Sequence, residues 1–175
     1  RVNSMQWIES FCDKFAKYLG VIISFLLILM MVNVAFDTLN RYLMNSNSVA
    51  LQEMEWHLFS VIILLGTSYA LNKEGHVRVD IFYTNFSAKK KAIINMVGVI
   101  TFVLPLSLLV AFGSLGFVAE AYNFMEQSGD PGGLHYRFII KGLIPTAFFI
   151  LIFMSIGYFA RNYNLLKRLN SSSDS

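Results

Sequence analysis

Four long apolar stretches, separated by short polar segments, dominate the chain and cover residues 18–42, 56–72, 92–120 and 138–161. A helix rises about 1.5 Å per residue, so roughly 20 apolar residues cross the ~30 Å hydrocarbon core of a membrane. The second stretch is short and needs local thinning of the bilayer or cover by a partner, whereas the third should tilt and kink at Pro105. The pattern predicts an all-α integral membrane protein with four transmembrane helices.

A weaker apolar pattern precedes the first stretch, in residues 3–17. The apolar side chains that recur there at helical spacing are Met5, Ile8, Cys12 and Phe15. This spacing predicts an N-terminal amphipathic helix lying on the lipid surface, and the alternative is a plain extension of the first spanning helix. Residues 1–169 would then form a single domain, followed by a serine-rich, disordered tail at residues 170–175.

Composition agrees with lipid as the solvent. Hydrophobic residues make up 55% of the 175 and charged residues only 14%, which is more apolar surface than a soluble domain of this length could bury. The single Cys12 excludes an internal disulfide and a multi-cysteine metal site. The net charge of +3 does not indicate nucleic-acid binding, because the basic residues form short clusters beside apolar spans.

The basic residues are divided unevenly between the two ends of the predicted helices. Eleven of the 14 fall on one side and three on the other. Because positive charge stays cytoplasmic, we expect both termini inside and the loops at residues 43–54 and 122–137 outside. The run Lys89-Lys90-Lys91 is expected to contact anionic lipid.

The apolar stretches have no ionisable residue near the membrane midplane, where ion and solute pathways usually need one. This favours a chain that transports nothing by itself, although an independent small channel or carrier remains the alternative. Glu53 and His57 have the spacing of a zinc-ligand pair, but no second cluster supplies further ligands. Acids favoured at a helix N-terminus explain this pattern more simply. We therefore expect no enzyme activity, no metal and no cofactor.

Several charged or small residues are candidates for contacts between helices or with a partner. Arg41 follows the first span and needs a carboxylate if it is partly buried, so we predict a clamp from Arg41 to Glu55 or to a partner. The alternative is a solvated Arg41 that reaches out to water. Trp56 should anchor the second helix at the lipid interface. Gly66 belongs to a set of small residues that let helices approach closely in lipid.

Two loops contain further candidates. In the inner loop, a turn at Gly75 precedes His76, Arg78 and Asp80; no nucleophile is nearby, so we expect Arg78 and Asp80 to tie the loop to a neighbouring surface. In the outer loop, residues 123–137 are either a plain connector or a docking surface. The outer-loop candidates are Asp130, Gly132, Gly133 and Arg137. Lys141, one turn into the last helix, should reach outward or pair with Glu120.

The segment QEMEWHLFSVIILLGTSYALNKEGHVRVDIFY resembles the small membrane subunit, the Q-type component, of tripartite ATP-independent periplasmic (TRAP) transporters. The resemblance extends to Asn40-Arg41-Tyr42 and to the GDPGGL motif with Arg137 and Lys141, and covers about residues 18–160. It implies a structural subunit of the bacterial inner membrane that scaffolds a large transport subunit and assists docking of a periplasmic substrate-binding protein. Sodium-coupled uptake of an organic acid would then use sites in the large subunit.

Overall fold

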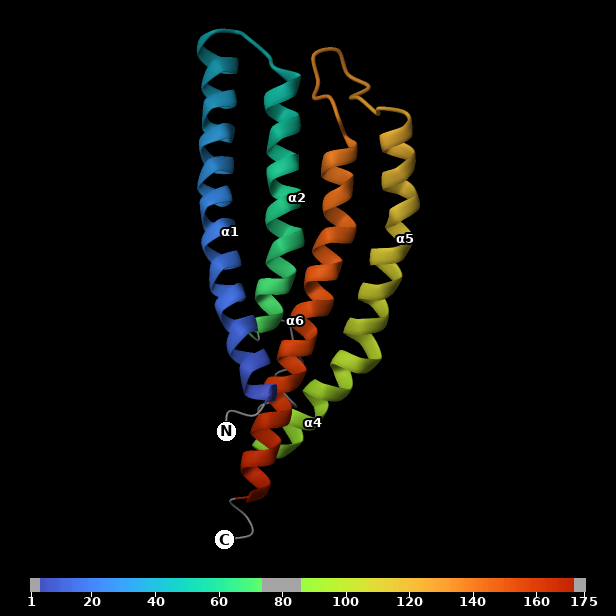
Figure 1. The fold of residues 1–175 in the computed structure, drawn as a ribbon. Coiled ribbons are helices and arrows are strands. Elements are labelled where there is room, and N and C mark those ends of the chain that lie inside the picture. The colour runs from blue at the N-terminus through green and yellow to red at the C-terminus, as the bar shows by residue number, and fades with distance from the viewer. Residues whose placement is uncertain (1–3, 74–85, 172–175) are drawn as a thin grey trace.

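A computed structural model describes residues 4–73 and 86–171 of the chain (Figure 1). Within these residues the elements are α1 (Ser4–Leu43), α2 (Val49–Asn72), α4 (Ala88–Gly98), the π-helical segment η1 (Val99–Val103), α5 (Leu104–Asn123) and α6 (Phe138–Ser171). The described residues contain four helical stretches long and apolar enough to cross a membrane, with α4, η1 and α5 forming the third. The predicted all-α fold with four spans is confirmed.

α1 is one continuous helix that includes the predicted surface helix. Its 40 residues extend for about 60 Å, roughly twice the thickness of the hydrocarbon core. The helix therefore extends well beyond the hydrocarbon, and residues 4–17 continue the first span, as the alternative reading expected. Whether this extension lies along the lipid surface stays a prediction.

α2 and α6 are longer than the sequence pattern predicted. α2 begins at Val49 rather than at residue 56, because Ser48 caps it by accepting a hydrogen bond from Leu51 N–H (3.5 Å). Its 24 residues extend for about 36 Å, which crosses a membrane without local thinning. α6 continues through Ser171, so the expected tail starts later than residue 170, and residues 172–175 lie outside the described part.

The third span is irregular immediately before Pro105. Proline has no N–H and disturbs the helix in the turn that precedes it. Here Leu104 N–H donates to Val99 O, five residues back, and the segment Val99–Val103 is π-helical. The ribbon bends along this stretch (Figure 1), which agrees with the distortion predicted at Pro105.

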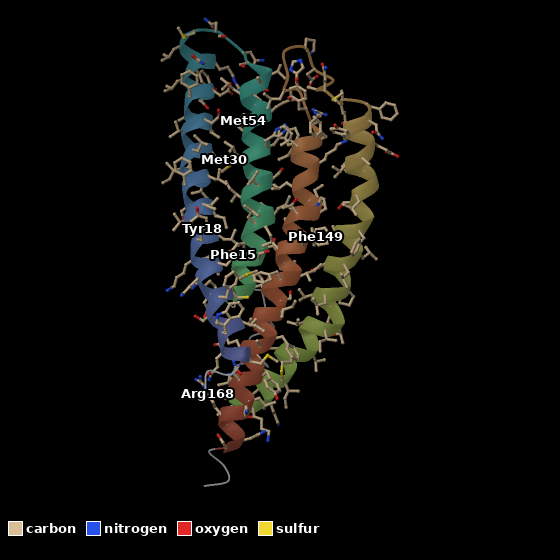
Figure 2. The ribbon with its side chains drawn as sticks, viewed as in Figure 1. Phe15, Tyr18, Met30, Met54, Phe149 and Arg168 are labelled. Carbon is tan, nitrogen blue, oxygen red and sulfur yellow. The ribbon has the colours of Figure 1, made fainter. Side chains whose placement is uncertain are left out.

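α6 is the central helix of the described fold and packs against α1, α2, α4 and α5. At one end of the molecule α1, α2, α6 and α5 stand side by side, and at the other they converge (Figure 1). The buried core lies where they converge and consists of Cys12, Ala16, Leu71, Val99, Leu151, Met154 and Tyr158. Elsewhere large apolar side chains face outward, including Tyr18, which is 68% exposed and projects from α1 (Figure 2). Such a row of helices suits a protein whose remaining faces are covered by lipid or by another protein.

Two glycines allow α1 to approach its neighbours closely. A Cβ atom added at Gly157 of α6 would lie 2.4 Å from Cys12 Sγ, and one added at Gly20 would lie 2.7 Å from Cε2 of Tyr69 on α2. Both positions therefore need the small side chain, as expected for helices that associate by close packing in lipid.

Candidate functional site

The outer loop, residues 124–137, folds back onto α2 around one buried carboxylate. Glu53 is 5% exposed, and Ser128 Oγ (2.5 Å) and Arg137 Nη2 (2.8 Å) donate to its Oε1. Leu134 N–H donates to Oε2 (2.5 Å). Both oxygens of Glu53 are thus occupied by groups from the loop, and we call these four residues the Glu53 node. The node fixes the loop to the first turns of α2.

Two glycines give the outer loop the shape that the node requires. Gly132 has φ of +82°, a left-handed conformation that glycine adopts without strain. A Cβ atom added at Gly133 would lie 2.3 Å from Ser128 Oγ and 2.8 Å from Glu53 Oε2. Gly133 N–H also donates to the carbonyl oxygen of Asp130 (3.1 Å), which closes the turn. The predicted pair Gly132 and Gly133 therefore acts through backbone geometry, and the exposed Asp130 contributes its main chain.

Arg137 connects the node to Trp56, which is exposed on α2. Its guanidinium carbon lies 5.7 Å from the centroid of the Trp56 ring, within cation–π range. Its backbone N–H donates to the carbonyl oxygen of Glu126 (3.0 Å). Its Nε is buried and has no hydrogen-bond partner among the described residues. The predicted candidates Arg137 and Trp56 are thus in contact, and the Nε donor of Arg137 has no acceptor among the described residues.

Lys141 pairs with Glu126, so the predicted pairing with Glu120 is wrong. The chain doubles back after α5, where Glu126 N–H donates to the carbonyl oxygen of Ala121 (3.0 Å). This reversal brings Glu126 over the first turn of α6, while Glu120 stays exposed on α5. The ammonium of Lys141 also lies 3.9 Å from the centroid of the Phe117 ring. Lys141 therefore joins the outer loop, α5 and α6.

The predicted clamp between Arg41 and Glu55 is wrong for the described residues. Arg41 forms its ion pair with Asp37, one turn earlier on α1. Asp37 is 1% exposed, so this local pair neutralises a buried carboxylate. Glu55 is half-buried on α2.

The start of α2 explains why the neighbouring acid, Glu53, was missed. Because the helix begins at Val49, Glu53 and Glu55 are both helical and point about 200° apart. Only one of them can face the other helices, and it is Glu53. The sequence contained a signal for this: Glu53 lies 18 residues from the buried Leu71, which is about five helical turns and therefore the same face.

Four predicted candidates remain: Gly66 on α2, and three residues of the predicted inner loop. A Cβ atom added at Gly66 would meet nothing within 4 Å, so this glycine allows no close approach within the described chain. His76, Arg78 and Asp80 lie outside the described residues.

The pair Glu53 and His57 does not form a metal site in the described structure. His57 Nδ1 lies 2.6 Å from the backbone oxygen of Glu53, and the Glu53 carboxylate is occupied by the node. Among residues 4–73 and 86–171, no group of three or more His, Cys, Asp or Glu side chains could hold a metal ion.

Comparison with known proteins identifies the chain. The family described as "Tripartite ATP-independent periplasmic transporters, DctQ component" matches residues 30–165, which include every member of the Glu53 node. The chain belongs to this family. It is a small membrane subunit of a TRAP transporter, and the resemblance seen in the sequence is confirmed. The family is one of transporter components rather than of enzymes. No curated protein and no solved structure matches the chain.

The small TRAP subunit has a second polar network at its other end, which the sequence analysis did not predict. Arg161 on α6 pairs with Asp13 on α1, and its Nη1 donates to the carbonyl oxygen of Asn72 at the end of α2 (2.8 Å). Asn72 Nδ2 donates to Asp13 Oδ1 (2.9 Å). Beside them, Asn164 Nδ2 donates to Glu9 Oε2 (2.8 Å). We call this network the inner node, because it lies at the end that the sequence predicts to be cytoplasmic. It joins α1, α2 and α6, and satisfies a carbonyl that the end of α2 leaves without a helical partner.

The charged side chains of this multi-pass TRAP subunit lie toward the two ends of its spans. Met54, beside Glu53 and Glu55, lies near the start of α2, and Arg168 lies near the end of α6 at the opposite end of the molecule (Figure 2). The intervening stretches without Asp, Glu, Lys or Arg are residues 18–36, 58–71, 92–119 and 142–160. The two nodes therefore lie at opposite ends, with apolar helix between them.

Proposed function

We propose that this TRAP subunit is a structural component: it holds the large membrane subunit and assists docking of the soluble substrate-binding protein. The observation that carries this proposal is a set of exposed apolar side chains on the outer loop, which we call the docking patch. Its exposed side chains are Phe124 (83%), Met125 (51%) and Tyr136 (59%). Exposed apolar side chains at the polar end of a membrane protein favour contact with another protein.

The Glu53 node gives this patch a fixed position. Tyr136 directly precedes Arg137, which is bonded to Glu53, and Met125 N–H donates to the carbonyl oxygen of Tyr122 (3.1 Å). Met125 and Tyr136 have positive φ angles of 43° and 63°, a backbone conformation that L-residues rarely adopt. A docking surface held in one conformation loses less entropy on binding than a flexible one.

The arrangement of the spans supports an indirect part in transport. The described helices stand side by side at the outer end (Figure 1), and α6 packs against α1, α2, α4 and α5. The apolar middle of each span also lacks the ionisable residues that line ion and proton pathways. We therefore assign the substrate and sodium sites to the large subunit, and to this chain a supporting part in sodium-coupled uptake of an organic acid.

The orientation we propose follows from the positive-inside rule. The start of α1 and the end of α6 lie at the same end of the molecule (Figure 1), and this inner end carries most of the Lys and Arg residues. Both termini are then cytoplasmic, and the outer loop faces the periplasm of a bacterial inner membrane.

Reconstitution tests the proposal directly. Proteoliposomes containing this chain alone should show no sodium-driven solute uptake, and uptake should appear when the large subunit and the binding protein are added. Replacing Phe124 and Tyr136 by Ser should weaken capture of the binding protein, while the complex with the large subunit is retained. Solute flux through the chain alone would contradict the proposal, and so would unchanged capture by the double variant.

A further inference from the structure

A groove of about 450 Å³ opens between α2, α5 and α6 near the outer end of the spans. Its walls are apolar except at Ser60. The wall residues are Phe59, Ile63, Leu64, Phe117, Ile140 and Ile144. Trp56, Arg137 and Lys141 also line the groove, near the start of α2 and around the start of α6. An apolar groove with a tryptophan and two cations at one end matches one leaflet of a bilayer, which is apolar inside and polar at its surface.

The two cations keep hydrogen-bond donors beyond those that their carboxylate partners use. Arg137 donates from Nη2 to Glu53 Oε1 and to Ser128 Oγ, while its Nη1 has no hydrogen-bond acceptor in the described part of the chain. Lys141 has three N–H donors, and Glu126 is its ion-pair partner. A phosphate group offers several strong acceptor oxygens, and Arg and Lys are the side chains that usually bind it.

The size of the groove distinguishes a lipid chain from a protein helix. A helix with its side chains is about 10 Å across, so it would fill ~450 Å³ within about 6 Å of its length, roughly one turn. A helix would therefore cover the groove without entering it. A flexible acyl chain is narrow enough to run along the apolar walls from the rim inward.

We propose that this groove binds one phospholipid, with an acyl chain between α2, α5 and α6 and the phosphate at Arg137 and Lys141. The lipid fills the space that the row of helices leaves between α2 and α5. Its phosphate accepts hydrogen bonds from donors at the rim. This site is distinct from the docking patch on the outer loop, and the proposal does not depend on the proposed function.

Tryptophan fluorescence provides a direct test, because the chain has only two tryptophans, Trp7 and Trp56. In the Trp7→Phe variant of the full chain, Trp56 alone reports. In nanodiscs of zwitterionic lipid, phosphatidylglycerol with brominated chains should quench Trp56 in a saturable way at low mole fraction. Diacylglycerol with the same chains should bind about tenfold more weakly, as expected for loss of one charge-assisted hydrogen bond. The Trp56→Phe variant, in which Trp7 reports from the other end, should show quenching that rises only in proportion to mole fraction.

Equal quenching of Trp56 by the two brominated lipids would overturn recognition of the phosphate, and proportional quenching at Trp56 would overturn the site itself. Native mass spectrometry gives a second measurement. Ile144→Trp, which fills the groove, should lose a retained phospholipid that wild type keeps. Leu109→Trp is the matched control, because Leu109 is 71% exposed on α5 and does not line the groove. A photoreactive side chain at Ile63 should form a lipid adduct in cell membranes, and an adduct with a polypeptide would refute the proposal.

Discussion

Glu53 and Arg137 are 84 positions apart in the chain, yet Arg137 Nη2 lies 2.8 Å from Glu53 Oε1. One residue belongs to the first turns of α2, and the other directly precedes α6. Between them the outer loop adds Ser128 Oγ and Leu134 N–H to the same carboxylate. This pair is therefore the link through which the loop is held on the helices.

Removing the charge of Glu53 should release the outer loop. Glu53→Gln keeps the size of the side chain, but its amide nitrogen cannot accept the hydrogen bond that Oε2 now accepts from Leu134 N–H. We expect cleavage within residues 124–137 at lower protease concentrations and a fall of several degrees in the thermal midpoint. The control Glu55→Gln changes an acid two residues away that lies outside the node. Equal protease sensitivity of the two variants would contradict the importance of the node.

Gly133 should tolerate no side chain, whereas Gly129 in the same loop should accept one. Gly133→Ala places a methyl group 2.3 Å from Ser128 Oγ, and overpacking of this kind typically destabilises by about 1–3 kcal/mol. Gly129→Ala is the matched control, because a Cβ atom there meets nothing within 4 Å. Unfolding in mild detergent, followed by the fluorescence of Trp56 in the Trp7→Phe background, should separate the two variants. A stable Gly133→Ala variant would mean that the loop can adopt another conformation.

Arg41 should couple energetically to Asp37 and not to Glu55. Double-mutant cycles with Ala at each position test this, because residues in direct contact show interaction energies of about 0.5–3 kcal/mol and independent residues add. Arg41→Ala alone should destabilise the chain, since it leaves Asp37, which is 1% exposed, without its cation. Coupling of Arg41 to Glu55 would restore the clamp that the sequence suggested.

Arg161 should hold the inner ends of α1, α2 and α6 together. Arg161→Gln removes the ion pair with Asp13 and shortens the side chain that reaches the carbonyl oxygen of Asn72. Hydrogen bonds to charged groups contribute about 1.5–3 kcal/mol each, so a clear loss of thermal stability is expected. Lys167→Gln, on the exposed surface of α6, removes the same charge and should have little effect. If both variants had the same thermal midpoint as the wild type, the inner node would contribute no stability.

The sequence determined the number and approximate position of the spans. Each span needs about 20 apolar residues, and this requirement is local, so it can be read from hydropathy alone. The ends of the helices were less predictable. Gln52, Glu53 and Glu55 make residues 49–55 resemble the end of a loop. Ser48 nevertheless caps the helix at its true start, so these polar residues lie in its first turns.

The sequence also drew attention to Arg137, Lys141, Gly132 and Gly133, but it could not give their partners. Which acid meets Arg137 depends on the rotation of α2 about its axis, because Glu53 and Glu55 point about 200° apart. Likewise, Glu126 rather than Glu120 meets Lys141 because the chain reverses immediately after α5. Hydropathy carries no information about such reversals.

By itself, then, the sequence determined that this is a four-span membrane protein of the DctQ family with most of its basic residues on one side of the spans. The tertiary structure alone decided that the spans stand in a row around α6, that Glu53 and Arg161 organise the two ends, and that a groove separates α2 from α5. The physical reason is the difference in range. Solvation by lipid acts on each segment separately, whereas ion pairs and close packing depend on the distance and rotation of segments that are far apart in the chain.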